Sequence, residues 1–371
     1  MNSFENTKKN FGFGCMRLPM IDKEVDIEQF TKMVDVFMEN GFNYFDTAHV
    51  YIGGKSELAL KECLTSRYNR DEYVLTDKLS GSNFNSEEEL ERLLNEKLEA
   101  CGVKYFDFYL MHAQNRNNFE KFKKCKAYEF ALKKKEEGKI KHLGISFHDT
   151  ADILEKILIE YPEIEVVQIQ FNYLDYLDPE VQGKLCYEVC RKYNKPIIVM
   201  EPVKGGKLAN LPEDAKKVLT DLNNGSPASY AIRYVCSFPG VYMTLSGMSN
   251  MEQMLDNLSY MKEFTPLNED EFKAIDKVIE VINSYDTISC TNCRYCVDGC
   301  PKQIKIPDLF SCYNSKIVFD DSWSKYYYTS VLTKKYTSPS ECIKCGKCEK
   351  ICPQHLNIIE LLKVVDKEFQ D

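Results

Sequence analysis

Two groups of closely spaced cysteines lie near the C-terminal end of the 371-residue chain. Both follow the pattern C-x₂-C-x₂-C-x₃-C-P, which brings thiols together on one short segment. Thiolates are the preferred protein ligands of soft metal ions, and a reducing compartment disfavours disulfides. The groups hold eight of the chain's sixteen cysteines, namely Cys290, Cys293, Cys296 and Cys300, and Cys342, Cys345, Cys348 and Cys352. We therefore expect two metal centres here.

The spacing of each group resembles the cysteine run of bacterial ferredoxins, which binds [4Fe–4S] clusters. Zinc is the alternative, but zinc ribbons separate two C-x₂-C pairs widely and lack the trailing Cys-Pro. In two-cluster ferredoxins the fourth cysteine of each run binds the other cluster. The resemblance therefore implies one cluster on Cys290, Cys293, Cys296 and Cys352, and a second on Cys342, Cys345, Cys348 and Cys300.

Residues 284–371 are predicted to form a separate small domain, because the regular patterning of the preceding chain ends where the cysteine groups begin. The linker between the groups, residues 301–341, is much longer than in small ferredoxins and includes a helical stretch. It resembles the mainly α-helical two-cluster domains of respiratory iron–sulfur subunits. We expect a ferredoxin-like domain of that kind.

Polar side chains capable of chemistry follow the ends of short apolar runs earlier in the chain. They are Asp46, Lys78, His112, Ser146 and Gln168. The runs alternate with segments of helical spacing, and about eight such repeats predict an α/β fold, a (β/α)₈ TIM barrel over residues 1–283. Barrel enzymes build their sites at the carboxyl ends of the strands, so we expect these side chains to meet. The opening stretch, residues 11–18, fits either a strand or a hairpin at the barrel floor.

The barrel region resembles the aldo-keto reductases over about residues 10–285. Asp46-Thr47-Ala48 followed by Tyr51 matches that family's Asp-Thr-Ala-x-x-Tyr signature, and Lys78 and His112 match its strand-end lysine and histidine. The resemblance implies a catalytic tetrad of Asp46, Tyr51, Lys78 and His112. With the cysteine groups, the chain resembles the iron–sulfur branch of that family.

Carbonyl reduction needs a hydride on carbon and a proton on oxygen. A tyrosine with a pKa of about 10 is a poor acid–base group at neutral pH, and a nearby ammonium lowers that pKa. We expect Lys78 to do this for Tyr51, Asp46 to hold Lys78, and His112 to orient the carbonyl. The alternative is a structural ion pair and a core histidine.

The nicotinamide contacts depart from the family pattern at two positions. Ser146 and Gln168 match the residues that hold the nicotinamide amide, but Phe147 stands where an Asn is expected. Met200 occupies the place of an aromatic residue that stacks on the ring. We expect Met200 to pack against the nicotinamide instead.

Residues 246–257 resemble the family's nucleotide site, with small residues for a phosphate at a helix N-terminus and polar residues for adenine and ribose. A plain loop and capped helix is the alternative. No Arg or Lys lies within this stretch, but Lys204 and Lys207 can reach it from the preceding loop, so NADP(H) and NAD(H) both stay candidates. The expected contacts are Ser246, Gly247, Ser249, Gln253, Asp256 and Asn257.

Charge and hydropathy limit the partners. The net charge is −9, which disfavours nucleic acid, and no apolar run approaches the roughly 20 residues of a membrane span. The N-terminal residues 1–10 are polar and lack the apolar stretch of a signal peptide. We expect a cytoplasmic protein that acts on a small-molecule carbonyl or alcohol.

The combined features predict an oxidoreductase that couples NAD(P)H-dependent carbonyl chemistry to electron transfer through two clusters. Because a hydride carries two electrons and a cluster passes one, FMN is a candidate converter, and a ferredoxin, flavodoxin or other redox protein a candidate partner. One alternative is an ordinary reductase with structural or sensory clusters. Another is a non-catalytic, nucleotide-binding electron-transfer or redox-sensing protein. Specificity is expected in residues 80–86, 113–125 and 201–226, and residues 114–126 are predicted to be a solvated loop.

Overall fold

The computed structural model describes residue 4, residues 6–290 and residues 292–370. The chain divides into two compact units, one of residues 1–208 and 224–272 and the other of residues 209–223 and 273–371. The sequence-predicted boundary between residues 283 and 284 falls within the second unit and stays a prediction. Each unit is described by itself.

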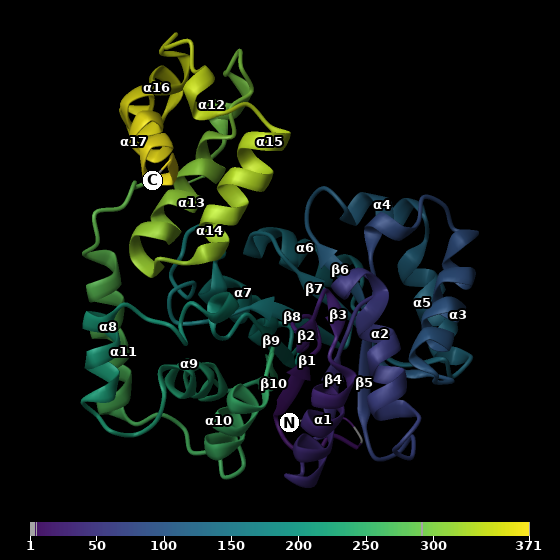
Figure 1. Cartoon of the computed structure of the whole chain (residues 1–371). Coiled ribbons are helices and arrows are strands. Elements are labelled where there is room, and N and C mark those ends of the chain that lie inside the picture. The colour runs from purple at the N-terminus through teal and green to yellow at the C-terminus, as the bar shows by residue number, and fades with distance from the viewer. Residues whose placement is uncertain (1–3, 5, 291, 371) are drawn as a thin grey trace. The chain divides into compact units, whose positions relative to one another are not determined.

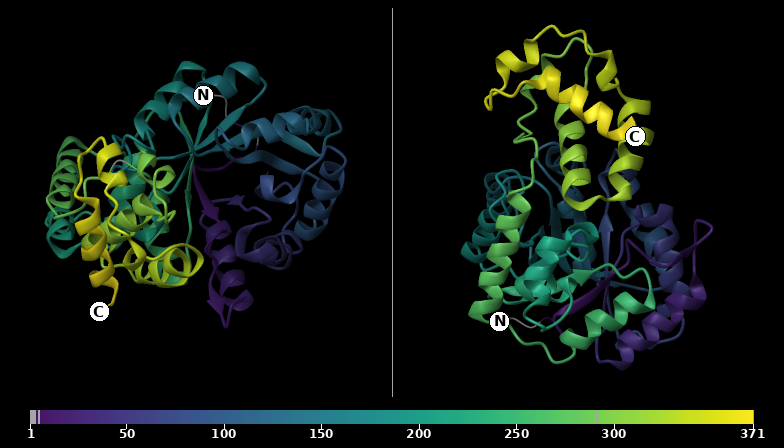
Figure 2. Two further views of the ribbon diagram at one scale, coloured as in Figure 1. Left: turned by 90° about the horizontal axis from the view of Figure 1, so that it is seen from above. Right: turned by 60° about the vertical axis from the view of Figure 1, so that its left-hand side comes forward.

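Eight parallel strands of the first unit close into a barrel in the order β1-β10-β9-β8-β7-β6-β5-β4, with helices around them (Figures 1 and 2). The predicted (β/α)₈ barrel is confirmed. Because β1 pairs with β4 and β10, the opening stretch is the first barrel strand, and a hairpin of β2 (Met20–Ile21) and β3 (Glu24–Val25) follows it. The barrel strands are β1 (Phe11–Gly14), β4 (Tyr44–Asp46), β5 (Val74–Leu79), β6 (Phe106–Gln114), β7 (Ile140–Phe147), β8 (Val166–Gln170), β9 (Ile197–Met200) and β10 (Val241–Ser246).

The helices form where capping and periodicity agree. In α1, Asp26 accepts a hydrogen bond from the Gln29 backbone N–H at 3.0 Å and caps the helix, whose buried side chains recur every three or four residues. Within the described part of the chain, no helix is long and apolar enough to cross a membrane. The helices before residue 284 are α1 (Ile27–Glu39), α2 (Lys55–Leu60), α3 (Glu89–Cys101), α4 (Phe119–Lys124), α5 (Ala127–Glu136), α6 (Ala151–Glu160), α7 (Gly183–Lys192), α8 (Glu213–Thr220), α9 (Pro227–Cys236), α10 (Met251–Met261) and α11 (Glu269–Asn283).

Helix α4 corrects the expectation of a solvated loop over residues 114–126. Phe119 and Phe122 on this helix are both buried, and the ring centroid of Phe122 lies 5.0 Å from that of Phe84. A helix of six residues is too short for its apolar periodicity to stand out in the sequence. The segment is packed structure rather than free loop.

The barrel interior explains where the polar side chains gather. Tyr44, Val74, Phe108, Val166 and Ile198 belong to one buried cluster inside the barrel. Side chains of a strand alternate between its two faces, so positions two or four residues further along share the inward face. These positions carry Asp46, Lys78, His112, Gln168 and Met200 at the carboxyl ends of their strands.

The C-terminal part of the second unit is mainly helical, as predicted. Its core packs α13 against α17, and the ring of Tyr328 stacks on that of Phe369 with centroids 4.2 Å apart. Cys296, Cys312 and Cys348 belong to the same core. The helices are α12 (Tyr295–Asp298), α13 (Ile306–Phe319), α14 (Ser322–Tyr327), α15 (Thr333–Lys335), α16 (Lys347–Ile351) and α17 (Ile358–Gln370).

A buried ion pair ties α9 to the start of α11. Arg233 makes two hydrogen bonds to Glu271, at 2.7 and 3.0 Å, and donates a third to the Thr265 carbonyl oxygen at 3.0 Å. Both charged side chains are almost fully buried. A buried pair of this kind is costly to break, because the remaining partner keeps an uncompensated charge.

We expect Glu271→Ala to lower the free energy of unfolding by about 3 kcal/mol, since Arg233 would stay buried without its carboxylate. The measurement is denaturant unfolding followed by far-ultraviolet circular dichroism. Glu269→Ala, an exposed change on the same helix, is the control and should have little effect. Equal losses in the two variants would show that the ion pair contributes nothing beyond the helix itself.

Candidate active site and metal centres

A buried ion pair lies at the carboxyl end of the barrel. The ammonium of Lys78 bonds to Asp46 Oδ1 and donates to the Thr47 carbonyl oxygen at 2.9 Å. Gln168 Nε2 donates to the other carboxylate oxygen of Asp46 at 3.1 Å. Burial acts to lower the pKa of Lys78, but Asp46 and Tyr51 outweigh it and hold that pKa above its ordinary value. The lysine is therefore charged at neutral pH.

Tyr51 lies beside this pair. The Lys78 ammonium is 4.9 Å from the centroid of the Tyr51 ring, and the ring of His112 meets that of Tyr51 edge to face at 5.9 Å. Burial raises the pKa of Tyr51, and the Lys78 charge lowers it by less, so the net direction is upward. The expected effect of Lys78 is present, but it does not bring the pKa below its ordinary value. Tyr51 is a protonated phenol at neutral pH.

His112 is neutral. Burial and the Lys78 charge, with a contribution from His148, lower its pKa to about 2. Ser80 Oγ lies 2.7 Å from His112 Nδ1 and fixes the orientation of the ring. A neutral, oriented imidazole can hydrogen-bond a carbonyl oxygen without giving up a charge. Sequence reasoning missed this contact of Ser80, which lies directly after β5 and two residues past Lys78.

The turn that carries Tyr51 is held from both sides. Tyr51 N–H donates to the Ala48 carbonyl oxygen at 2.9 Å, and Ser56 Oγ bonds to Thr47 Oγ1 at 2.7 Å. Between them Ile52 adopts φ 52° and ψ 34°, a left-handed conformation that costs a β-branched residue free energy. The strained residue, Ile52, directly follows Tyr51, and the two hydrogen bonds hold the turn in this conformation.

The predicted nicotinamide contacts are partly engaged within the chain. Ser146 and Gln168 are register partners on β7 and β8, so they are adjacent as expected. Gln168 is bonded to Asp46, however, and Phe147 is buried. Met200 ends β9 and is half-buried.

The stretch at the start of α10 is also internally bonded. Ser249 N–H donates to Gln253 Oε1 at 2.7 Å, and Asn257 Nδ2 donates to Ser246 Oγ at 2.9 Å. Asp256 accepts a hydrogen bond from Ser226 Oγ at 2.7 Å. Gly247 is exposed, so the backbone before the helix is accessible to a phosphate.

Arg17 is a cation near this stretch that sequence reasoning missed. Its carbonyl oxygen accepts a hydrogen bond from Ser249 Oγ at 3.0 Å, and its half-exposed guanidinium lies 3.9 Å from Glu201 after β9. Lys204, in contrast, forms an ion pair with the buried Asp175, and Lys207 follows it in the same loop. Arg17 lies in the loop after β1. It is 229 positions before Ser246, the first residue of the stretch that it contacts.

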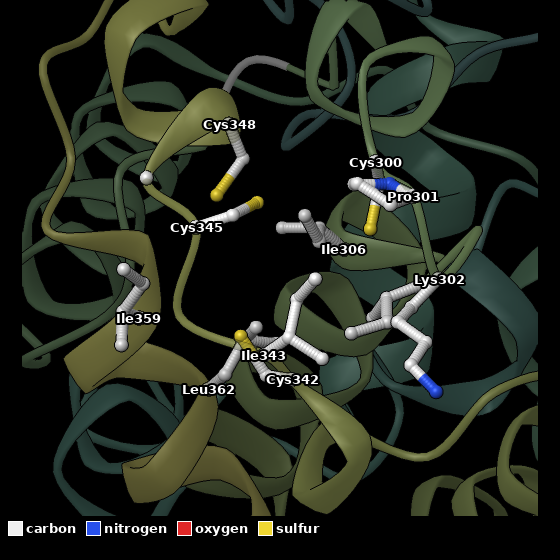
Figure 3. Close-up of a pocket in the computed structure, with 12 residues that line it drawn as sticks. Cys300, Pro301, Lys302, Ile306, Cys342, Ile343, Cys345, Cys348, Ile359 and Leu362 are labelled. Carbon is white, nitrogen blue, oxygen red and sulfur yellow. The ribbon is translucent and has the colours of Figure 1, made fainter.

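The eight clustered cysteines line two separate cavities in the C-terminal unit. One cavity, of about 330 Å³, is shown in Figure 3, where the four sulfur atoms surround a common space. A second cavity measures about 320 Å³. Each takes three cysteines from one run and the fourth from the other. The sets are Cys300, Cys342, Cys345 and Cys348 in the first, and Cys290, Cys293, Cys296 and Cys352 in the second.

This grouping is the one expected for crossed fourth ligands, so the residues present fit two [4Fe–4S] clusters. Burial raises the pKa of the Cys296 and Cys348 thiols to about 12 and about 11 respectively. Thiolates at these positions would thus need a bound cation to be stable. The ligand assignment itself stays a prediction.

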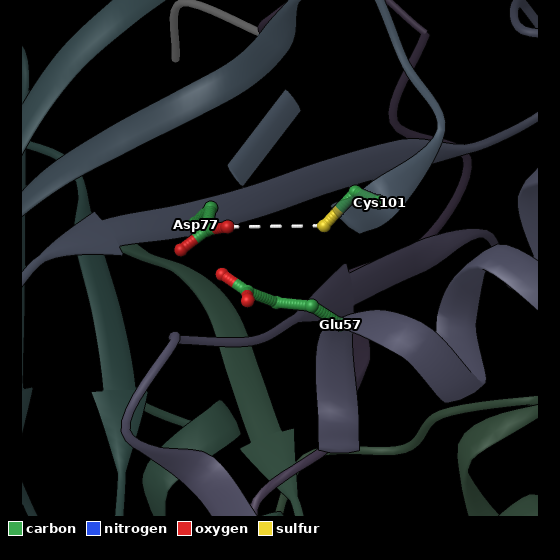
Figure 4. Close-up of side chains that lie close together, drawn as sticks. All are labelled: Glu57, Asp77 and Cys101. Atoms are coloured by element: carbon green, nitrogen blue, oxygen red, sulfur yellow. Dashed lines mark hydrogen bonds between the residues drawn. The ribbon is translucent and has the colours of Figure 1, made fainter. Parts of the chain in front are cut away.

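A buried network lies next to Lys78. Figure 4 shows Glu57, Asp77 and Cys101, whose thiol donates to Asp77 at 3.8 Å. Such a trio can hold a metal ion, but the Lys97 ammonium already lies 3.4 Å from Glu57 and 3.3 Å from Asp77. Burial and the Asp77 charge raise the pKa of Glu57 to about 7. His49 Nδ1 also lies 2.7 Å from Glu57 Oε2, so the Glu57 carboxyl lies between an imidazole and the Lys97 ammonium.

These features define a parallel (β/α)₈ barrel with polar side chains gathered at the carboxyl ends of its strands, followed by a cysteine-rich helical unit. The chain belongs to the Aldo/keto reductase family, whose sequence profile matches residues 10–280. A 4Fe-4S dicluster domain profile matches residues 289–358. The chain is therefore an aldo-keto reductase-type oxidoreductase with a C-terminal iron–sulfur domain.

Relatives share the barrel at low identity. The chain is similar to the uncharacterized oxidoreductase YqkF of Bacillus subtilis, 23% identical over 300 residues that cover 71% of the chain and 90% of the relative. An aldo-keto reductase of Klebsiella pneumoniae in complex with NADPH superposes with a TM-score of 0.60 at 18% identity, covering 73% of this chain and 90% of that one. The aldo-keto reductase AKR11C1 of Bacillus halodurans, in its holo form, gives a TM-score of 0.59 at 24% identity, covering 72% and 91%.

Glu57 should make stability depend on pH. Its pKa of about 7 in the fold exceeds the ordinary 4.5, so this contribution to stability is fully present below pH 4.5 and lost as pH rises through 7. We expect a loss on the order of 3 kcal/mol over that window, and a much smaller loss in Glu57→Gln, measured by denaturant unfolding at several pH values. Glu62→Gln, an exposed change in the next helical turns, should keep the wild-type slope. Equal slopes in wild type and Glu57→Gln would refute the assignment.

Crossed cluster ligands can be tested by iron content. Cys352→Ser with Cys293→Ser removes two ligands of one predicted cluster and should leave about half of the roughly eight iron atoms of the wild type. Cys352→Ser with Cys345→Ser removes one ligand from each cluster and should leave far less iron. An uncrossed arrangement predicts the reverse order. The samples are purified anaerobically and their iron is measured chemically.

Proposed function

We propose that the barrel interconverts carbonyl and alcohol groups with NADP(H) or NAD(H), and that two [4Fe–4S] clusters exchange electrons with a redox partner. The observation that carries the proposal is the buried Lys78–Asp46 pair beside Tyr51 and His112 at the barrel mouth. A buried lysine with a fixed carboxylate next to a phenol is an arrangement suited to proton transfer.

In the direction of reduction, Tyr51 donates the proton to the carbonyl oxygen. Its raised pKa keeps that proton in place at neutral pH, and the Lys78 ammonium stabilises the phenolate that remains. Asp46, bonded to Lys78 and Gln168, fixes the ammonium. His112 stays neutral and holds the carbonyl oxygen by a hydrogen bond. The nicotinamide, when bound, supplies the hydride.

The nucleotide would lie along the start of α10. Gly247 leaves the backbone accessible there, and Arg17 offers a half-exposed guanidinium for a phosphate. The NADPH complex of the related Klebsiella enzyme supports this cofactor class. Ser146, Gln168, Met200, Lys207, Ser249, Gln253, Asp256 and Asn257 stay predicted contacts.

The clusters would be held by the two cysteine sets and would supply one-electron transfer. Because a hydride brings two electrons, coupling to the barrel needs a converter, and FMN is the candidate. The external partner would be a ferredoxin, flavodoxin or other redox protein.

A second candidate function leaves the clusters structural or sensory. Cys296 and Cys348 lie in the core of the C-terminal unit, with Cys290, Cys300, Cys342 and Cys352 packed against it. Groups bound there would stabilise this unit whether or not electrons pass through them. The two candidates share the barrel chemistry and differ in what the clusters do.

Tyr51→Phe removes the proton donor, so we expect kcat for NADPH-dependent reduction of 4-nitrobenzaldehyde to fall about 10³-fold. Nucleotide binding, followed by NADPH fluorescence, should be unchanged. Tyr105→Phe, at the opposite end of β6, is the control and should keep full activity. Full activity in Tyr51→Phe would overturn the tetrad assignment.

A second experiment tests whether electrons pass from NADPH to the clusters. The anaerobic wild type is mixed with NADPH alone. Loss of cluster absorbance together with a paramagnetic resonance signal of reduced clusters supports coupling. Unchanged clusters with intact aldehyde reduction support the second candidate.

A further inference from the structure

The segments that line one of the two cysteine cavities are rich in lysine. Segments 300–305 and 342–350, which carry Cys300, Cys342, Cys345 and Cys348, contain five lysines and one carboxylate. That carboxylate, Glu349, accepts a hydrogen bond from the Ile359 N–H at 2.9 Å and is thus engaged at the start of α17. The exposed lysines are Lys302, Lys344, Lys347 and Lys350, for which no ion pair occurs among the residues that the structure describes.

The other cavity lacks this charge. Segments 290–298 and 352–357 carry only Arg294 and Asp298 as formal charges. Arg294 donates to Asp308 at 2.7 Å, so its charge is balanced locally. Both cavities have one exposed cysteine, Cys293 or Cys345, so they differ in charge rather than in access.

An apolar side chain and a groove accompany the lysines. Ile343 is 56% exposed between Cys342 and Lys344. Figure 3 shows Lys302 leading away from the four sulfur atoms. A groove of about 510 Å³ that includes Cys342 and Lys344 continues along α17, where its charged lining is mixed: Asp366, Lys367, and Lys363, which pairs with Glu360. We call Lys302, Lys344, Lys347, Lys350 and Ile343 the lysine face.

We propose that the lysine face docks an acidic one-electron carrier protein at the cluster held by Cys300, Cys342, Cys345 and Cys348. The inference rests on the proposed exchange of electrons through the clusters and names the face and the charge of the partner. In each encounter one electron passes, so the carrier is oxidised by one electron and the cluster reduced by one, or the reverse.

Charge complementarity selects this partner. The chain as a whole carries a net charge of −9, so an acidic protein is repelled by most of its surface and attracted to a local basic face. Protein interfaces typically combine an apolar core with a polar rim, and Ile343 is an exposed apolar side chain directly beside Lys344 in the chain. Long-range attraction raises the encounter rate and orients the carrier toward the exposed Cys345.

The test measures binding to the anaerobic holoprotein by biolayer interferometry. The probes are oxidised flavodoxin, which is acidic, and cytochrome c, which is basic. The variant carries Lys302→Glu, Lys344→Glu and Lys347→Glu, and a milder one carries the same three positions as Lys→Gln. The control carries Lys325→Glu, Lys334→Glu and Lys335→Glu, an equal charge change at exposed positions of the same unit.

We expect flavodoxin affinity to fall roughly tenfold or more in the Glu variant, less in the Gln variant, and least in the control. Wild-type affinity should weaken with added salt, and the Glu variant should lose most of that dependence. Equal losses in variant and control, or tighter binding of cytochrome c than of flavodoxin, would overturn the proposal.

The outcome is separable from that of the proposed function. Iron content, cluster reduction by dithionite and aldehyde reduction by NADPH are measured on the same samples. If these persist and flavodoxin binding does not depend on the lysine face, the docking proposal fails alone. If NADPH never reaches the clusters while face-dependent flavodoxin binding persists, coupling to the barrel fails and the docking face stands.

Discussion

The active end of the barrel depends on one buried ion pair, between Lys78 and Asp46. Two opposite charges without solvent are tolerable only if each finds further partners, and here the Thr47 carbonyl oxygen and the Gln168 amide provide them. These four residues come from β4, the turn after it, β5 and β8, so strand register decides whether the pair forms at all. The same ammonium acts to lower the pKa of both Tyr51 and His112, although burial has the larger effect on each. The strands of the barrel thus fix the position of the Lys78 ammonium.

A second constraint governs the C-terminal unit. Its core contains cysteines alongside leucines and aromatic residues, and the two cavities lie within that core rather than on an independent scaffold. Small domains with few apolar residues commonly rely on metal centres for stability. The same eight cysteines would therefore bind the groups that transfer electrons and the groups that stabilise the fold of this unit.

Much of the barrel could be predicted from sequence, because the end of a strand is visible as the point where an apolar run gives way to a polar residue. Asp46, Lys78 and His112 are such points. The sequence could not predict contacts between side chains that are far apart in the chain and close only in the folded structure. Arg17 contacts a stretch more than 200 positions away, and the Lys97 network joins residues of α2, β5 and α3. The upward pKa of Tyr51 also escaped prediction, since it depends on burial, which a pattern of residue types does not measure.

The division of cysteines between the two cavities has a consequence for biosynthesis. A ribosome delivers the chain from the N-terminus, and domains fold in that order. The first compact unit, residues 1–208 and 224–272, precedes the second cysteine run and can fold while that run is still being made. Neither cavity can close early, however, because one requires Cys352 and the other requires Cys342, Cys345 and Cys348. Cluster assembly in these cavities would therefore be a late event, on a chain whose barrel strands have already been synthesised.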